Sequence, residues 1–292
     1  MKTAFMFPGQ GSQAVGMGRE LYQADGAARA VFDEVEAAVG GGVLDLIWDG
    51  PMDLLSMAAN AQSAIFAVSM AMWAGTSGSV ARDNREGMVL GHSLGEYSAL
   101  CAAGAISITD AARLLRRRGE LMQSAVPVGM GAMAAIIGPG WTVNFVAEIC
   151  AEASGDGHIV SIANDNGVGQ VVISGARAAV ERAVEIAIAR GAKLAKVLPI
   201  STPAHSAMMQ PAAAPFRAAV DAAVWTAPKL PFISNKTADL MSDVPEIKDA
   251  LVYQLTHGVR FRECVLCART LGAEEFIEIG PGNVLGGIVK RI

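Results

Sequence analysis

The segment Gly-His-Ser-Leu-Gly at residues 91–95 constrains the fold of this chain more than any other feature. An apolar run over residues 88–90 precedes it, and an alanine-rich stretch of helical character over residues 96–103 follows it. A strand, a Gly-x-Ser-x-Gly turn and a helix make up a nucleophile elbow, in which two glycines let the backbone turn sharply beside an exposed serine hydroxyl. The helix directs free N–H groups and its positive dipole end to the same place. The segment predicts acyl transfer through an acyl-serine at Ser93; the alternative is an ordinary turn in a chain with 32 glycines.

Length and composition favour a folded enzyme. The 292 residues suffice for one large domain or two smaller ones. With 52% hydrophobic and only 17% charged residues, the chain does not have the composition of a disordered protein. The formal net charge of −5 argues against non-specific binding to nucleic acid, because no large basic field is present to displace counterions.

Two apolar stretches are candidates for membrane or targeting segments. Residues 57–75 are apolar, but polar residues such as Asn60 and Gln62 interrupt them, which predicts a buried helix rather than a membrane span. The apolar run at the N-terminus stops at Pro8 and does not form a secretory signal. We therefore expect a cytoplasmic protein that does not bind a membrane.

Four cysteines are present, and they do not have the spacing of a disulfide framework. Cys264 and Cys267 form a Cys-x-x-Cys motif, for which zinc or redox chemistry is the alternative to a structural role. No second such pair and no paired histidines accompany it, and it lies in a helical pattern. It therefore predicts two small buried thiols one helical turn apart, and we expect no metal or redox cofactor.

The order of apolar runs and helical patterns predicts an α/β fold. A strand over residues 3–7 ends in a turn rich in glycine and glutamine, the position at which an α/β sheet builds its site. Further strands are predicted over residues 88–90, 232–235 and 275–279, and helices over residues 20–39, 44–49, 60–72, 96–103, 245–257 and 263–271. We assign residues 1–127 and 200–292 to a large α/β-hydrolase-like catalytic domain with a parallel sheet.

Residues 128–199 are predicted to interrupt this domain, because the composition changes near residues 126–129. The predicted elements are a strand (132–137), a helix (143–153), two strands (158–162 and 170–174), a helix (178–190) and a strand (194–198). The order β-α-β-β-α-β is that of the ferredoxin-like split βαβ unit. We therefore predict a small ferredoxin-like subdomain inserted between the two halves of the catalytic domain.

A serine needs a positioned base before it is nucleophilic near neutral pH, and the chain offers four histidines. His92 lies in the elbow and is expected to point away from the serine. His158 begins a predicted strand of the insert, and His257 ends a predicted helix, where it suits the helix dipole. His205 follows the strand that returns from the insert to the catalytic domain, so by elimination it is the best base. No acidic residue is suitably placed to orient its ring, and a backbone carbonyl can take that role.

One arginine is predicted to face inward from the helix that Ser107 caps. Arg118 lies on the same side as the apolar residues of this helix, whereas Arg113 and Arg117 share another face with Glu120 and are expected to be solvated. An inward guanidinium is too costly to leave unpaired. Its partner is either an internal Asp or Glu or a substrate carboxylate bound bidentately.

A series of short motifs occurs in order along nearly the whole chain: residues 7–13 (Phe-Pro-Gly-Gln-Gly-Ser-Gln), 60–62 (Asn-Ala-Gln), 91–97 (Gly-His-Ser-Leu-Gly-Glu-Tyr), 118–119 (Arg-Gly), 131–133 (Gly-Ala-Met), 169–175 (Gly-Gln-Val-Val-Ile-Ser-Gly), 203–205 (Pro-Ala-His) and 280–285 (Gly-Pro-Gly-Asn-Val-Leu). Together these motifs resemble those of malonyl-CoA:acyl carrier protein transacylases. They are most similar to the discrete bacterial acyltransferase of fatty-acid synthesis. The resemblance implies the same fold and the same activity.

The resemblance also implies roles for individual residues. Ser93 would be the nucleophile, His205 its base and Arg118 the group that binds the malonyl carboxylate. The backbone N–H groups of Gln10 and Leu94 would form the oxyanion hole. These roles agree with the elbow, the histidine and the inward arginine that the residues themselves indicate.

Further positions follow from the same resemblance. The main-chain carbonyl of Gln254 would orient the base, which accounts for the missing acid. The pocket-lining positions that match the family are Gln62, Met122, Asn164 and Asn166. Ala204 departs from the family, in which Ser or Phe is frequent at this place. A small residue there would not exclude an α-methyl group, so the departure affects the expected acyl selectivity.

The implied reaction is a ping-pong transfer of malonyl from malonyl-CoA to the phosphopantetheine thiol of acyl carrier protein. We expect these two partners and a monomeric enzyme. The alternatives are a related acyltransferase of a polyketide or malonate decarboxylase system, a serine esterase, and a non-catalytic scaffold of the same fold. An esterase has no use for an inward-facing arginine, and a scaffold has no need to retain the nucleophile, the base and the arginine together.

Overall fold

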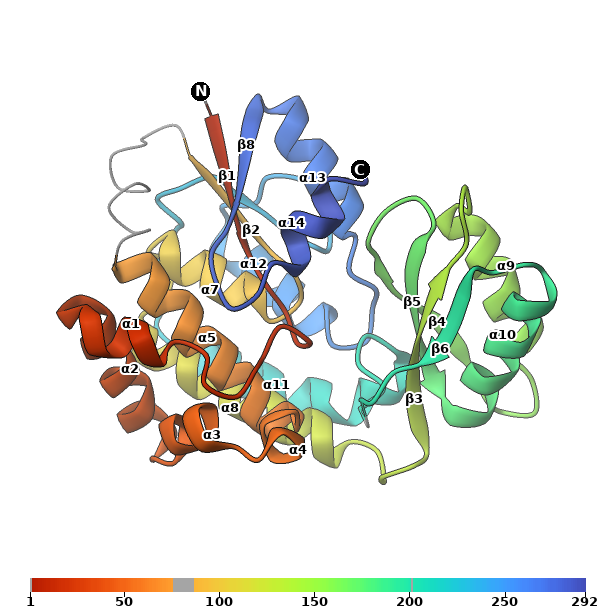
Figure 1. The fold of residues 1–292 in the computed structure, drawn as a ribbon, viewed down its shortest axis with the longest axis horizontal. Helices are drawn as coiled ribbons and strands as arrows, with labels where there is room; N and C mark the ends of the chain where they lie inside the picture. Colours follow the sequence, from red (N-terminus) through yellow and green to blue (C-terminus); the bar gives the residue numbers. More distant parts are fainter. Residues whose placement is uncertain (1, 76–86, 201) are drawn as a thin grey trace.

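The computed structural model describes residues 2–75, 87–200 and 202–292, which form two lobes (Figure 1). The large lobe contains a parallel four-stranded sheet, and the small lobe contains an antiparallel four-stranded sheet. The predicted α/β class, with a parallel sheet and a separate smaller sheet, is confirmed. The space between the two lobes is where the loops of both sheets meet.

The parallel sheet has the strand order β7-β2-β1-β8. Its strands are β1 (Lys2–Phe7), β2 (Met88–Gly91), β7 (Phe232–Ile233) and β8 (Ala273–Glu278), and every neighbouring pair is parallel. Because parallel strands end at the same edge, the residues that follow β1, β2 and β7 in the chain gather there. This edge faces the small lobe and positions the site.

Alternating residues of the strands belong to two apolar clusters, one on each face of the sheet. Phe5 and Phe7 pack with the helices of the larger cluster, whereas Ala4 and Met6 pack with α13 (Phe261–Thr270) and α14 (Val284–Val289). The helices near the larger cluster are α1 (Arg19–Ala24), α2 (Gly26–Val39), α3 (Val43–Asp49), α4 (Met52–Leu55), α5 (Ala58–Ala74), α7 (Gly95–Ala102), α8 (Ile108–Ser124), α11 (Gln210–Ala222) and α12 (Val244–Tyr253). The sheet is therefore covered on both faces, as buried parallel sheets require.

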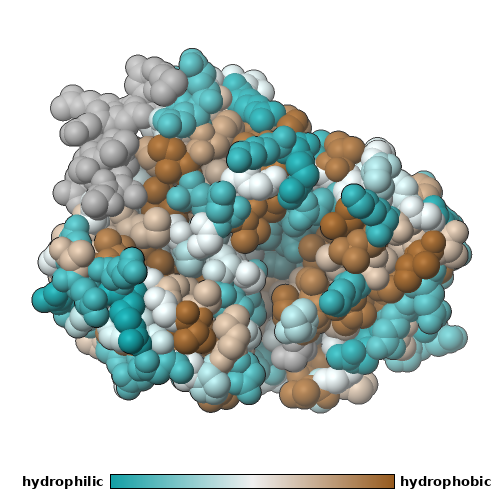
Figure 2. Space-filling model, viewed as in Figure 1, coloured by the Kyte–Doolittle hydropathy of each residue, from teal (hydrophilic) through white to brown (hydrophobic). Residues whose placement is uncertain are grey.

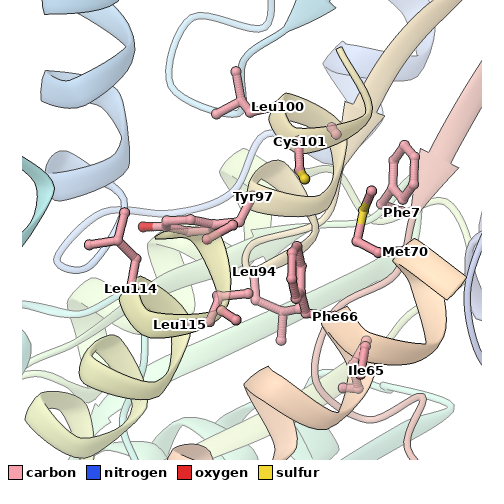
Figure 3. Packing of buried hydrophobic residues seen from close by; sticks show 14 of the residues in the cluster. Phe7, Ile65, Phe66, Met70, Leu94, Tyr97, Leu100, Cys101, Leu114 and Leu115 are labelled. Atoms are coloured by element: carbon pink, nitrogen blue, oxygen red, sulfur yellow. The ribbon is translucent and has the colours of Figure 1, made fainter. Parts of the chain in front are cut away.

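Helices α5 and α7 lie inside the large lobe. Figure 3 shows Phe66 from α5, Tyr97 from α7 and Leu115 from α8 packed around Leu94, the residue that follows the elbow serine. The prediction of a buried helix within residues 57–75 is confirmed, since most residues of α5 are buried. In the described part of the chain, no helix combines the length and the hydropathy that a membrane span requires.

The small lobe contains β3 (Gly131–Ile137), α9 (Val143–Ala153), β4 (Val160–Asp165), β5 (Gln170–Ala176), α10 (Arg177–Ala189) and β6 (Leu194–Val197). The sheet order is β4-β5-β3-β6, and the element order is the predicted β-α-β-β-α-β. Ala134 and Ile173 pack toward α9 and α10, whereas Met133 and Val172 line the cavity between the lobes. We propose residues 128–199 as the limits of this inserted subdomain.

The structure differs in detail from the predicted helices. The single helix expected over residues 20–39 is divided into α1 and α2 at Asp25, whose extended backbone ends α1 and whose carboxylate caps α2 by accepting from two N–H groups. Helix α11 and the short 3₁₀ turn before it, Ala207–Met209, were not predicted. Proline normally interrupts a helix, but Pro215 is tolerated in α11 because Phe216 and Val220 pack into the core.

A close approach of α5 and α8 gives the first testable prediction. A Cβ at Gly119 of α8 would lie 2.3 Å from the carbonyl oxygen of Ala58, at the start of α5. Gly119→Ala is expected to lower the free energy of unfolding by about 1–3 kcal/mol, because the two helices must separate. Urea unfolding followed by circular dichroism measures the change.

The matched control is Gly26→Ala in the first turn of α2, where nothing lies within 4 Å of the added Cβ. This variant is expected to be as stable as the parent chain or about 0.5–1 kcal/mol more stable. Equal stabilities of the two alanine variants would contradict the argument from helix contact.

Candidate active site

Ser93 lies in a backbone turn that only the surrounding glycines permit. Its φ is 55°, in the left-handed region that costs a non-glycine residue energy, and its side chain is almost buried. A Cβ at Gly91 would lie 2.0 Å from the carbonyl carbon of Gly95, and a Cβ at Gly95 would lie 2.0 Å from the carbonyl oxygen of Phe7. The two glycines therefore let the turn close on itself and pack against β1. The result is a serine hydroxyl at the carboxyl end of β2, beside the first turn of α7.

His205 lies opposite this hydroxyl. Its Nε2 is 2.8 Å from the Ser93 Oγ, and its Nδ1 is 2.7 Å from the carbonyl oxygen of Gln254. Because a carbonyl only accepts, Nδ1 has the proton and donates it to Gln254, so the lone pair of Nε2 faces the serine. Burial, together with the positive charge of Arg118, lowers the pKa of His205 to about 3, although the Gln254 carbonyl acts in the opposite direction. The ring is therefore a neutral base at physiological pH.

Arg118 enters the same site from α8 and is 1% exposed. Its Nη1 donates to Gln62 Oε1 at 2.8 Å, and its Nη2 donates to Gln254 Oε1 at 2.8 Å and to Ser93 Oγ at 3.2 Å. The guanidinium carbon also lies 5.8 Å from the centre of the Tyr97 ring. An internal Asp or Glu as the direct partner is wrong for the described residues, because neutral amide oxygens take that place. The charge remains available to an anion that enters the cavity.

The N–H groups of Gln10 and Leu94 are the candidates for binding an anionic oxygen. Both residues line the cavity next to Ser93, and among the described hydrogen bonds neither backbone N–H has a protein acceptor. The turn after β1 is fixed by the Gln10 side chain, which donates to the Ser56 carbonyl at 3.1 Å. A Cβ at Gly9 would lie 2.7 Å from the His92 carbonyl oxygen, so this turn packs directly on the elbow.

The cavity lies between the two lobes, where Figure 2 shows a recess in the surface. Of the pocket positions that the resemblance implies, the cavity is lined by Met122, Asn164 and Asn166. Gln62 is fully buried behind the cavity and reaches it only through its bonds to Arg118 and, at 3.5 Å, to the sulfur of Met122. Apolar side chains of both lobes complete the wall, among them Met133, Val172, Leu198, Ala204, Leu285 and Ile288. Such a mixture of apolar walls and few polar groups is typical of a small-molecule site.

The side chains of the other histidines make no hydrogen bond with the Ser93 hydroxyl in the described structure. His92 turns away from it, and its Nε2 lies 2.9 Å from Asn166 Oδ1, which joins the elbow to the small lobe. His257 stacks on the Tyr253 ring with centroids 3.6 Å apart. His158 lines a separate cavity beside β4. His205 is thus the histidine that the fold brings to the elbow.

The Cys-x-x-Cys motif lies on α13. Cys264 is buried and its Sγ is 3.5 Å from the Ser234 carbonyl, whereas Cys267 is only half-buried. Across residues 2–75, 87–200 and 202–292, no group of three or more Cys, His, Asp or Glu side chains is placed to bind a metal ion. Of the two predicted buried thiols, one is therefore buried and the other partly exposed.

Sequence reasoning missed two residues that surround the serine. Asn235, after β7, accepts from the Ser93 N–H at 3.0 Å through Oδ1 and donates to the Gly91 carbonyl at 2.8 Å through Nδ2. Glu96, in the first turn of α7, is 1% exposed and accepts from the Asn235 N–H at 2.6 Å. The signal for Asn235 was its position at the end of a parallel strand, and the signal for Glu96 was a lone carboxylate in an apolar helix.

Comparison with known proteins identifies the family. The sequence matches the acyl transferase domain over residues 4–291. It is 43% identical to the malonyl CoA-acyl carrier protein transacylase of Bacillus subtilis, over 100% of this chain and 90% of that protein. The crystal structure of acyl-carrier-protein-S-malonyltransferase from Bartonella henselae superposes with a TM-score of 0.95 at 48% identity, covering 100% of this chain and 92% of the other.

A second structure shows a relative with a carrier protein. It contains a malonyl-transacylase in complex with a holo type II PKS acyl-carrier protein, and it matches with a TM-score of 0.92 at 39% identity, over 100% of this chain and 93% of that chain. The domain match and the identities above 30% over the whole chain agree with one another. The chain belongs to the acyl transferase domain family, among the malonyl CoA-acyl carrier protein transacylases.

Proposed function

We propose that this chain transfers a malonyl group from malonyl-CoA to the phosphopantetheine thiol of acyl carrier protein, through a malonyl ester of Ser93, in fatty-acid synthesis. The observation that supports this most directly is the position of Arg118. Its guanidinium is buried, contacts the nucleophile at 3.2 Å and has no carboxylate partner among the described residues. An acyl group that has its own carboxylate supplies the missing partner, and malonate is such a group.

In the first half-reaction Ser93 attacks the thioester of malonyl-CoA. His205 Nε2 takes the hydroxyl proton as the new C–O bond forms, and the imidazolium keeps its bond to the Gln254 carbonyl. The carbonyl oxygen becomes an oxyanion that the N–H groups of Gln10 and Leu94 stabilise. The C–S bond then breaks, and the proton on His205 passes to the departing thiolate of CoA.

The second half-reaction reverses these steps with a different thiol. The phosphopantetheine thiol of the carrier protein gives its proton to His205 and attacks the malonyl-Ser93 ester. The same oxyanion site stabilises the intermediate, and the C–O bond to Ser93 breaks as the serine regains its proton. Arg118 holds the malonyl carboxylate in both halves, so the acyl carbon stays in one position while the thiols exchange.

The alternatives are less consistent with the site. A serine esterase gains nothing from a buried guanidinium beside its nucleophile, and that burial costs free energy. A related acyltransferase for polyketide or malonate decarboxylase systems would use the same residues and differ in its carrier protein. We propose that the enzyme is cytoplasmic and monomeric. Sedimentation of the purified protein measures its oligomeric state.

Formation of the acyl-enzyme is the most direct test. Incubation of the wild-type chain with malonyl-CoA, followed by intact-mass analysis, is expected to show one malonyl adduct. Ser93→Ala is expected to show none, because it lacks the attacking oxygen, while it keeps the same circular dichroism spectrum. Digestion and peptide sequencing would place the adduct. Labelling of the Ser93→Ala protein, or of a different residue in the wild type, would overturn the assignment.

Removal of the guanidinium is expected to affect malonyl and acetyl substrates differently. Arg118→Ala is expected to lower kcat/KM for malonyl-CoA by at least about a hundredfold, because a buried pair between charged groups loses one partner. Loading of acetyl-CoA, which has no carboxylate, is expected to change far less. Arg113→Ala, exposed on the same helix, is the matched control and is expected to leave both rates unchanged. A serine esterase would predict equal activities of all three proteins.

The lowered pKa of His205 predicts that the nucleophile stays active in mild acid. The base acts only when its ring is neutral. Because the pKa of His205 is lowered to about 3, the ring stays neutral from pH 7.5 down to pH 5 and the base remains active. An ordinary imidazole would be only about one-tenth neutral at pH 5.5. The measurement is the rate at which a neutral sulfonyl fluoride labels Ser93 between pH 4 and 8. A midpoint near 6.5 would contradict the expected effect of burial.

A further inference from the structure

Glu96 is a buried carboxylate that the reaction described above does not use. It lies in the first turn of α7, only three residues after Ser93, and is 1% exposed. Its Oε1 accepts from the Asn235 N–H at 2.6 Å, and its Oε2 accepts from Gln254 Nε2 at 2.5 Å. Burying a carboxylate is costly unless each oxygen has a donor, so both of these contacts are required.

The side chain of Gln254 connects Glu96 to Arg118. Its Oε1 accepts from Arg118 Nη2 at 2.8 Å, and its Nε2 donates to Glu96 and, at 3.1 Å, to the Ser93 carbonyl oxygen. A guanidinium can only donate, so it must face the oxygen of the amide. Both oxygens of the Glu96 carboxylate accept from N–H donors, so the carboxylate faces the nitrogen of the amide. These two charged neighbours permit one orientation of the Gln254 amide and exclude the reverse.

Asn235 fixes the other side of the same network. Its Oδ1 accepts from the Ser93 N–H and lies 3.3 Å from Gln254 Nε2, while its Nδ2 donates to the Gly91 carbonyl. The backbone of the elbow therefore determines the orientation of the Asn235 amide. Through these bonds the carboxylate, two amides and the guanidinium form one connected set, and such sets hold their members in a unique arrangement.

We propose that Glu96 is a positioning residue for the acyl carboxylate: it fixes the amide of Gln254, which in turn holds the Arg118 guanidinium beside Ser93. This extends the proposed function, in which Arg118 binds the malonyl carboxylate, and rests on it. Glu96 itself touches no substrate, since it lies behind Gln254. It also supplies, across one amide, the negative charge that Arg118 lacks in direct contact.

The pKa of Glu96 indicates that helix capping alone does not explain its buried position. Burial raises its pKa to about 7, against the lowering effects of the Asn235 N–H, of Ser234, of Arg118 and of Gln254. A carboxylate that only capped the start of α7 would gain the same helix-dipole interaction at an exposed place without this desolvation. The buried position is needed to reach Gln254.

Glu96→Gln is the sharpest variant, because it keeps the shape and changes the pattern of donors. If the new amide turns its oxygen toward Gln254, its nitrogen faces the Asn235 N–H. If it turns its nitrogen toward Gln254, that nitrogen meets the Gln254 nitrogen, unless the Gln254 amide reverses. Reversal would place the Gln254 nitrogen against the guanidinium. Each arrangement therefore contains one donor facing another donor, at Asn235, at Gln254 or at Arg118, and this strains the network that holds the guanidinium.

The experiment measures kcat/KM for acyl transfer from malonyl-CoA and from acetyl-CoA to the carrier protein. For Glu96→Gln the ratio of the malonyl to the acetyl value is expected to fall about tenfold to hundredfold, the effect of losing a hydrogen bond to a charged group. Glu96→Asp keeps a carboxylate one methylene shorter and is expected to lower the ratio less. Because Gln254→Leu cuts the same connection, the double variant Glu96→Gln/Gln254→Leu is expected to lose no more of the ratio than Gln254→Leu alone.

Glu36→Gln is the matched control. The Glu36 carboxylate accepts from the N–H groups of Gly42, Val43 and Leu44 at the start of α3 and has a purely structural role. This variant is expected to lose stability without any change in the ratio.

An unchanged ratio in Glu96→Gln, or an equal loss with both substrates, would overturn the proposal, because Glu96 would then support only the fold or the serine. Should Glu96→Gln fail to fold, Glu96→Asp decides the same question, since an unchanged ratio there is also contrary to the proposal. Failure of the proposed function is distinguishable from both results, because the wild-type enzyme itself would then form no malonyl adduct.

Discussion

The burial of the Arg118 charge is the constraint on which the rest of this structure depends. Burying a guanidinium at 1% exposure is costly unless acceptors replace water, and the large lobe supplies acceptors to its Nη groups from α5 through Gln62 and from the end of α12 through Gln254. The close packing of α8 on α5, which Gly119 permits, brings Gln62 within reach. Neutral acceptors bind both Nη groups without cancelling the charge, whereas the buried Nε has no hydrogen-bond partner among the described residues. The site thus keeps a fixed positive group for a ligand. The positions of α5, α8 and α12 are constrained, because each contributes to the contacts of this group.

The topology explains how distant segments supply the reacting groups. The order β7-β2-β1-β8 puts the turn after β1, the elbow after β2 and Asn235 after β7 at one edge of the sheet. The small lobe then closes the cavity through Asn164 and Asn166 at the end of β4, and the bond between His92 and Asn166 ties it to the elbow. Strands β1, β2 and β7 thus each contribute a polar group at the carboxyl end, which is the general rule for open parallel sheets.

The features that the sequence predicted are local along the chain, whereas the features that it missed depend on contacts between distant residues. The elbow at Ser93 is a local pattern, and Arg118 follows from the periodicity of one helix, so both could be found in short windows. The roles of Glu96 and Asn235 depend on a bond between residues 139 apart in the chain, which no window contains. Of the two alternatives for the partner of Arg118, the internal carboxylate assumes that a buried charge needs an opposite charge in contact, whereas amide oxygens accept from its Nη groups. Helix α11 was missed because its prolines are local signals that packing overrode.

Under the proposed function, the charge of Arg118 makes the basicity of His205 depend on whether the acyl carboxylate is bound. The guanidinium helps to hold the pKa of His205 low in the free enzyme, which makes the ring a weak base before substrate arrives. A malonyl carboxylate against Arg118 offsets that positive charge, so the basicity of His205 rises when the cavity holds the correct acyl group. The 3.2 Å contact from Arg118 to Ser93 Oγ acts in the same direction, because it stabilises negative charge on the attacking oxygen. An acyl group without a carboxylate would leave the base weaker. Selectivity would therefore arise in the chemical step as well as in binding.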